Sequence, residues 1–98
     1  MPTHPEPMQS LEELRNYVNQ ILCDHDQFEV NAFPITERIL LRSGKPCGIY
    51  FCLHGPRAVK LTAIWENTSN TILFYSSTGE RFHKVQLVEA PQLQTLAA

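Results

Sequence analysis

The chain has 98 residues, the length of one small domain, and its 43% hydrophobic content is enough to form one core. That content argues against a wholly disordered chain, and no apolar run approaches the roughly 20 residues that a membrane-spanning helix needs. The net charge of −2 argues against the strongly basic class of nucleic-acid-binding domains.

The charges are unevenly distributed along the chain. Residues 1–30 contain six acidic residues and a single arginine, whereas residues 38–84 contain seven basic and two acidic residues. Two interpretations remain open: an acidic helix complements a basic sheet within one molecule, or the basic half binds an acidic ligand.

The first nine residues contain three prolines and no periodic pattern, so we expect a disordered N-terminal arm over residues 1–9. They lack the basic and apolar regions of a secretory signal, which predicts a cytoplasmic location. The three cysteines are an odd number, which in that compartment predicts reduced thiols rather than a disulfide framework.

A helix start is encoded by Ser10 and Glu13, which match the two polar positions of a capping box. An apolar stripe at helical spacing follows and predicts an amphipathic helix over residues 11–23. Such a short helix is unstable alone in water and must dock on another element. The stripe consists of Leu11, Leu14, Val18, Ile21 and Leu22.

Five short segments of strand character follow, separated by connections of a few residues. Connections this short join antiparallel neighbours, since parallel strands need a long crossover. The sequence therefore predicts an α+β fold in which one N-terminal amphipathic helix packs on a curved five-stranded antiparallel meander. This single domain is expected over residues 10–89, followed by a loose tail over residues 90–98. The predicted strands span residues 37–42, 48–54, 57–66, 71–76 and 81–88, with a turn at residues 43–46.

Alternation along the strands separates two faces of the predicted sheet. The fourth strand is ambiguous, because its residues are apolar on both sides. The predicted helix-covered core comprises Ile39, Leu41, Ile49, Phe51, Leu53, Val59, Leu61, Ala63 and Trp65. The predicted second face carries Arg38, Leu40, Arg42, Tyr50, Cys52, His54, Lys60, Thr62, Ile64 and Tyr75.

The second face mixes basic, aromatic and apolar side chains, a composition that is frequent at interfaces. We therefore predict a small non-catalytic protein-interaction module that binds a protein partner, or a second copy as a homodimer, through this face. The alternative is an anionic ligand or single-stranded nucleic acid, held by cations and stacked on tyrosines, although the net acidity argues against nucleic acid. The candidate binding residues are Arg38, Arg42, Tyr50, Cys52, His54, Arg57, Lys60 and Tyr75.

Two Cys-x-His pairs, Cys23–His25 and Cys52–His54, raise the alternatives of zinc binding and of a cysteine nucleophile. The paired spacings typical of structural zinc sites are absent, and residues two apart on a strand point in parallel rather than toward each other. We therefore predict no metal, no cofactor and no catalytic residue, and the balance of the motifs favours a protein that is not an enzyme and does not enter a membrane.

Overall fold

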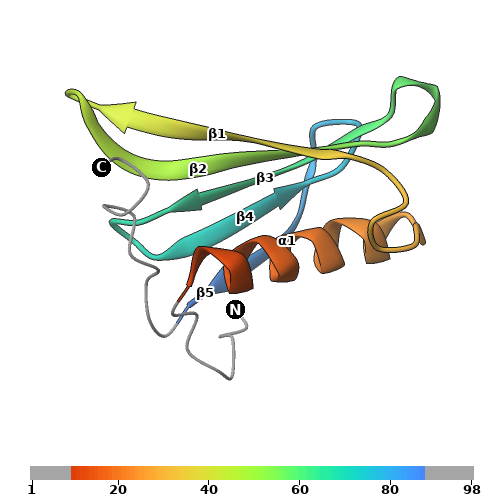
Figure 1. Ribbon diagram of the computed structural model, residues 1–98, viewed down its shortest axis with the longest axis horizontal. Helices are drawn as coiled ribbons and strands as arrows, with labels where there is room; N and C mark the ends of the chain where they lie inside the picture. The colour runs from red at the N-terminus through yellow and green to blue at the C-terminus, as the bar shows by residue number, and fades with distance from the viewer. Residues whose placement is uncertain (1–9, 88–98) are drawn as a thin grey trace.

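The computed structural model describes residues 10–87, which form one helix followed by a five-stranded sheet (Figure 1). The strands lie in chain order and each neighbouring pair is antiparallel, so the predicted α+β meander is confirmed. The predicted arm at residues 1–9 and tail at residues 90–98 lie outside the described residues. The elements are α1 (Leu11–His25), β1 (Ile35–Arg42), β2 (Lys45–His54), the short 3₁₀ turn η1 (Pro56–Ala58), β3 (Lys60–Glu66), β4 (Thr71–Tyr75) and β5 (Arg81–Gln86).

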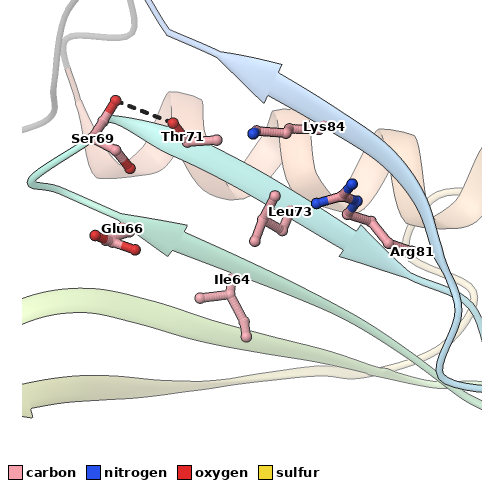
Figure 2. Close-up of a pocket in the computed structure, with 7 residues that line it drawn as sticks. All are labelled: Ile64, Glu66, Ser69, Thr71, Leu73, Arg81 and Lys84. Carbon is pink, nitrogen blue, oxygen red and sulfur yellow. Dashed lines mark hydrogen bonds between the residues drawn. The ribbon is translucent and has the colours of Figure 1, made fainter. Parts of the chain in front are cut away.

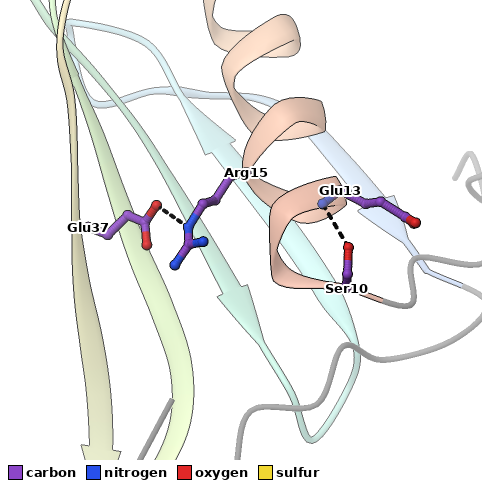
Figure 3. Close-up of polar contacts among 4 residues, drawn as sticks. All are labelled: Ser10, Glu13, Arg15 and Glu37. Carbon is purple, nitrogen blue, oxygen red and sulfur yellow. Dashed lines mark hydrogen bonds and ion pairs between the residues drawn. The ribbon is translucent and has the colours of Figure 1, made fainter. Parts of the chain in front are cut away.

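The helix begins where the sequence predicts. Ser10 has extended backbone angles, and its Oγ accepts a 3.1 Å hydrogen bond from the N–H of Glu13 (Figure 3). This bond satisfies one of the backbone donors that a helix leaves free at its N-terminus. Glu12 and Glu13 lie in the first turn, where the helix dipole favours negative charge.

The helix ends two residues later than predicted, at His25. Gln27 adopts a left-handed φ of 59°, and the N–H of Phe28 donates to the carbonyl of Cys23 at 2.8 Å. These are the marks of a Schellman ending, which glycine normally signals. Because a glutamine occupies the left-handed position here, the sequence contains no clear stop signal.

The core lies between α1 and one face of the sheet. Leu14, Val18 and Leu22 of α1 are fully buried, and Tyr17 meets Phe74 of β4 edge to face at 6.4 Å between ring centroids. Most of the predicted core residues are confirmed as completely buried. They are Ile49, Phe51, Leu53, Leu61, Ala63 and Trp65.

Two predicted core residues are exposed instead: Ile39 at 38% and Leu41 at 63%. Ile39 pairs with buried Ile49, so the alternation places it on the correct face. The prediction was wrong because α1 does not cover this part of that face. In Figure 1 the β1–β2 hairpin extends at the upper left, beyond the helix.

The hairpin between β1 and β2 is tighter than predicted. Ser43 and Gly44 have φ values of 53° and 78°, so two left-handed residues make the whole turn. Lys45 and Pro46, expected in the turn, therefore belong to β2. Cys47 is an extra residue in β2 relative to β1, because Leu40 pairs with Gly48 while Leu41 pairs with Pro46.

The third strand starts later than predicted. Arg57 and Ala58 adopt positive φ values of 58° and 62° within η1, which interrupts extended backbone. The strand therefore begins at Lys60, and the preceding Val59 is half-buried against the core. Within residues 10–87, no helix is both long and apolar enough to cross a membrane.

Candidate functional site

The face of the sheet opposite α1, here called the outer face, is crossed by a row of paired residues from all five strands. Arg38, Tyr50, Ile64, Leu73 and Lys84 are successive neighbours in this row. The three central side chains are half-buried, although no helix of residues 10–87 lies over them. The row is therefore an apolar strip with a cation at each end.

A second row runs beside the first. Thr36, Cys52, Thr62, Tyr75 and Arg81 occupy successive strands. Cys52 is only 5% exposed, whereas Tyr75 is half-buried. The outer face thus brings together two tyrosines and cations from both edge strands.

The surroundings of Tyr50 favour the neutral form of its hydroxyl. Burial raises the pKa of Tyr50, and the neighbouring Cys52, which is hydrogen-bonded to it, acts in the same direction, while Arg38 opposes the shift. A neutral phenol can donate a hydrogen bond as well as pack its ring, which suits it to a contact surface.

Cys52 and His54 do not form a reactive pair in this structure. The Nε2 of His54 lies 2.9 Å from Oγ1 of Thr36, so this ring is engaged with β1. Cys52 lies beneath its neighbours on the outer face. A thiolate nucleophile needs both access and a positioned base, and neither is present here.

The other Cys-x-His pair lies on the opposite side of the sheet. Cys23 is in the core, where its Sγ donates to Oδ1 of Asn19 at 3.3 Å. Burial, followed by the charge of Asp24, raises the pKa of Cys23, which favours the thiol. His25 stacks on Phe82 with ring centroids 3.8 Å apart. Among residues 10–87, no group of three potential metal ligands is present.

The predicted binding residues are only partly gathered. Seven of them share the outer face: Arg38, Arg42, Tyr50, Cys52, His54, Lys60 and Tyr75. Arg42 lies beside the β1–β2 turn, and Arg57 lies in η1 at the other end of β2. A single small ligand cannot contact both of these arginines, because the full length of β2 separates them.

The structure adds a hollow that was not predicted from the sequence. It has a volume of about 200 Å³ and lies over β3, β4 and β5 (Figure 2). This is smaller than the roughly 300–1,000 Å³ of a typical small-molecule pocket, so the hollow suits a side chain or a small ion better than a cofactor. Its lining residues are Ile64, Glu66, Ser69, Thr71, Leu73, Arg81 and Lys84.

Two cations of the hollow have no acidic partner within residues 10–87. The ion pairs among residues 10–87 are Arg15–Glu37 and the contact of His25 with Asp26, and neither involves Arg81 or Lys84. Figure 2 shows the side chains of both residues extending from β5 beside Leu73. The lining of the hollow therefore combines two cations and one carboxylate, Glu66, with the apolar side chains of Ile64 and Leu73.

Hydrogen bonds fix the polar end of the hollow. Oγ1 of Thr71 lies 3.1 Å from the carbonyl oxygen of Ser69 and 3.2 Å from Oε1 of Gln86. The Nε2 of Gln86 donates to the same Ser69 carbonyl at 2.7 Å. This network ties the β3–β4 turn to β5, so the end of the hollow is preformed.

A bulge in β5 explains why the hollow was not predicted from the sequence, where the faces of the fifth strand were left unassigned. Phe82 is an extra residue, since Tyr75 pairs with Arg81 while Phe74 pairs with His83. This bulge shifts the alternation of the side chains. Simple alternation counted from Arg81 therefore assigns the residues after Phe82 to the wrong face. The alternation of Lys84 and Gln86 with buried Val85 and Leu87 is the signal that places Lys84 on the outer face.

Comparisons with known proteins identify no relative: no family model, curated protein or solved structure matches the chain.

Proposed function

We propose that the protein is a small non-catalytic interaction module whose outer face binds a partner protein with acidic and apolar side chains. The observation that supports this function is the row in which Tyr50, Ile64 and Leu73 lie between Arg38 and Lys84. A partner that covers the strip removes apolar surface from water, and its acidic groups pair with the cations at the two ends.

The charge of the outer face favours a different protein over a second copy on this surface. Its cations include Arg38, Arg42, Lys60, Arg81 and Lys84, against the acidic Glu66. Two such faces stacked on each other bring like charges together, which costs association energy.

A displayed library of random peptides, selected on the wild-type protein, tests this function. We expect the enriched peptides to combine acidic residues with an apolar centre. Their affinity should fall about tenfold or more in Leu73→Asp and in Lys84→Glu, because each removes one half of the recognition chemistry. Both side chains are half-buried on the outer face rather than in the core, so the variants are expected to fold.

The matched control is Lys45→Glu, which reverses an exposed cation beside the β1–β2 turn. Binding that falls equally in this control would reflect net charge alone. Peptides that bind wild-type protein and Leu73→Asp with the same affinity would contradict the proposed surface, as would a selection without enrichment.

A second candidate function rests on Arg81 and Lys84, the two cations of the hollow, neither of which pairs with an acidic residue in the described part of the chain. Together with Tyr50 and Tyr75 they offer cations and aromatic rings to a single-stranded nucleic acid or another anion. The test is fluorescence anisotropy of a labelled oligothymidylate at rising salt. Phosphate contacts predict affinity that falls steeply with salt and falls again in Arg81→Ala. No binding at low salt rejects this candidate and leaves the protein-interaction function standing.

A further inference from the structure

Strand β1 is an open edge of the sheet. It pairs with β2 on one side, and no strand of residues 10–87 pairs with its other side. The N–H of His54 donates to the carbonyl of Pro34 at 2.9 Å, and this bond shows which residues of the β1 segment hydrogen-bond to β2. Even-numbered residues of β1 therefore direct their peptide groups at β2, and odd-numbered residues direct theirs outward. The outward residues are Ile35, Glu37, Ile39 and Leu41.

Two of the outward residues, Ile39 and Leu41, carry apolar side chains that nothing in the described chain covers, while Ile35 packs against the core and Glu37 pairs with Arg15. Ile39 is 38% exposed and Leu41 is 63% exposed, and they are two of the three large exposed hydrophobic residues among residues 10–87. Both project on the side of the sheet that carries α1, at the end of β1 that the helix leaves bare. Unpaired peptide groups and apolar side chains thus coincide on one short segment.

The two edges of the sheet differ in how well they resist pairing. β5 is bulged at Phe82 and carries Arg81 and Lys84, features that discourage a new strand from adding to an edge. β1 runs for eight residues without a proline or an extra residue of its own. Its two arginines, Arg38 and Arg42, project to the outer face, and the one charged residue of the outward row, Glu37, is already paired with Arg15.

We infer that β1 is a dimerisation edge, at which two copies of the chain pair their β1 strands antiparallel about a two-fold axis. A two-fold axis pairs each strand with an identical strand in reverse, so the outward row is complementary to itself. The result is a continuous ten-stranded sheet, with both copies of α1 on the same side and both outer faces on the other.

The charges select one register among those that bring the apolar residues together. An axis at Arg38 sets this residue against its own copy, and an axis at Leu40 sets Arg38 against Arg42. Like charges directly opposite each other destabilise a strand pair. An axis at Ile39 avoids both conflicts, because Arg38 then faces Leu40 of the second copy and Leu41 faces Glu37.

This register also predicts the salt dependence of the dimer. Arg38 and Arg42 of both copies lie on the outer face of the junction, where they repel each other diagonally. Added salt screens this repulsion, so dimerisation strengthens as salt rises. Binding of acidic partners or nucleic acid on the outer face weakens with salt instead, so the two activities are distinguishable.

Sedimentation velocity of the full chain tests the dimer, from about 10 µM to about 1 mM, the range of weak association. We expect a concentration-dependent monomer–dimer equilibrium whose dissociation constant rises tenfold or more in Leu41→Asp, which puts a second carboxylate opposite Glu37. Leu41 is 63% exposed, so this variant retains its core. The control Leu73→Asp, altered on the outer face, should dimerise like wild type.

Disulfide trapping tests the register. In a Cys47→Ser background, Ile39→Cys places two cysteines opposite each other on the axis, within bonding distance. The remaining Cys23 and Cys52 are buried. Mild oxidation should crosslink Ile39→Cys, while the control Leu41→Cys, separated from its own copy, stays monomeric on a non-reducing gel.

Three outcomes overturn the inference: a monomer throughout the concentration range, a dimer that Leu41→Asp leaves unchanged, or a dimer that Ile39→Cys fails to trap. A monomer is also the result expected if β1 accepts a strand from a different protein instead of from a second copy.

Discussion

The indole Nε1–H of Trp65 donates a 3.0 Å hydrogen bond to Oδ1 of Asn70. Trp65 is completely buried in β3, and Asn70 lies in the β3–β4 turn with a left-handed φ of 50°. The same asparagine donates its Nδ2–H to the carbonyl of Leu87 and accepts at its own carbonyl from the Leu87 N–H. One turn residue therefore satisfies the largest core side chain and holds the chain that follows β5.

Replacing Asn70 should cost stability through two separable causes. Asn70→Ala leaves the buried indole donor unpaired and forces alanine into a left-handed conformation, so we expect unfolding free energy to fall by about 2–4 kcal/mol. Asn70→Gly loses the same hydrogen bonds without the backbone strain and should cost about 1 kcal/mol less. Urea denaturation of both variants measures the difference. A loss below about 0.5 kcal/mol in Asn70→Ala would contradict this account.

The approach of β2 to β3 at Gly48 should tolerate no side chain. A Cβ at this position would lie 2.2 Å from the carbonyl oxygen of Trp65, a backbone atom that cannot move alone. We expect Gly48→Ala to destabilise the protein by about 3 kcal/mol or more. The control Gly44→Ala meets open space at a φ of 78°, so it should cost only the left-handed backbone strain of about 1–2 kcal/mol. Equal losses in the two variants would show that the close contact is relieved easily.

Stability should decline in alkaline solution. The pKa of Tyr17, Cys23 and Tyr50 is raised by burial from ordinary values of 10.0, 9.0 and 10.0. The folded state therefore holds these protons more tightly than the unfolded state. This contribution to stability is fully present below about pH 9. It is lost as the pH rises above the pKa values of the unfolded state toward the raised pKa values of the folded state.

Urea denaturation across this pH range measures the decline. Tyr50→Phe removes one of the groups from the outer face and should make the decline shallower, with a constant offset from wild type below pH 9. A variant curve parallel to wild type at every pH would show that Tyr50 does not contribute.

The three thiols should differ in reactivity. Cys23 is 1% exposed and Cys52 is 5% exposed, whereas Cys47 is half-buried in the bulge of β2. Near neutral pH a disulfide reagent should label one thiol rapidly in the folded protein and all three in denaturant, because access limits the reaction. Cys47→Ser should abolish the rapid phase. Rapid labelling of Cys52 in that variant would revive the idea of a cysteine nucleophile.

The ion pair between Arg15 and Glu37, with Nε and Oε2 2.6 Å apart, links α1 to β1 (Figure 3). Both side chains are partly exposed, so solvent screens the pair. We expect a double-mutant cycle of Arg15→Ala and Glu37→Ala to give a coupling free energy of about 1 kcal/mol or less. A larger coupling would mean that this contact, more than the core, holds the helix against the edge of the sheet.

Local patterns predicted much of the fold because they depend on near neighbours. Ser10 and Glu13 predicted the start of α1, and alternation around Phe51 and Trp65 predicted the core face of β2 and β3. The candidate surface was predicted in part for the same reason, since Tyr50 and Cys52 alternate with core residues. The acidic N-terminal part and the basic sheet were visible in composition alone.

The sequence by itself determined the order of the elements, the antiparallel pairing and the two faces of the central strands, because short connections and period-two alternation leave little choice. Only the tertiary structure decided how far α1 reaches over the sheet, and so why Ile39 and Leu41 are exposed while Ile49 is buried. It alone shifted the phase of β5 at Phe82, which brought Lys84 beside Leu73. Helix coverage and bulges depend on packing between distant segments, and no local pattern encodes them.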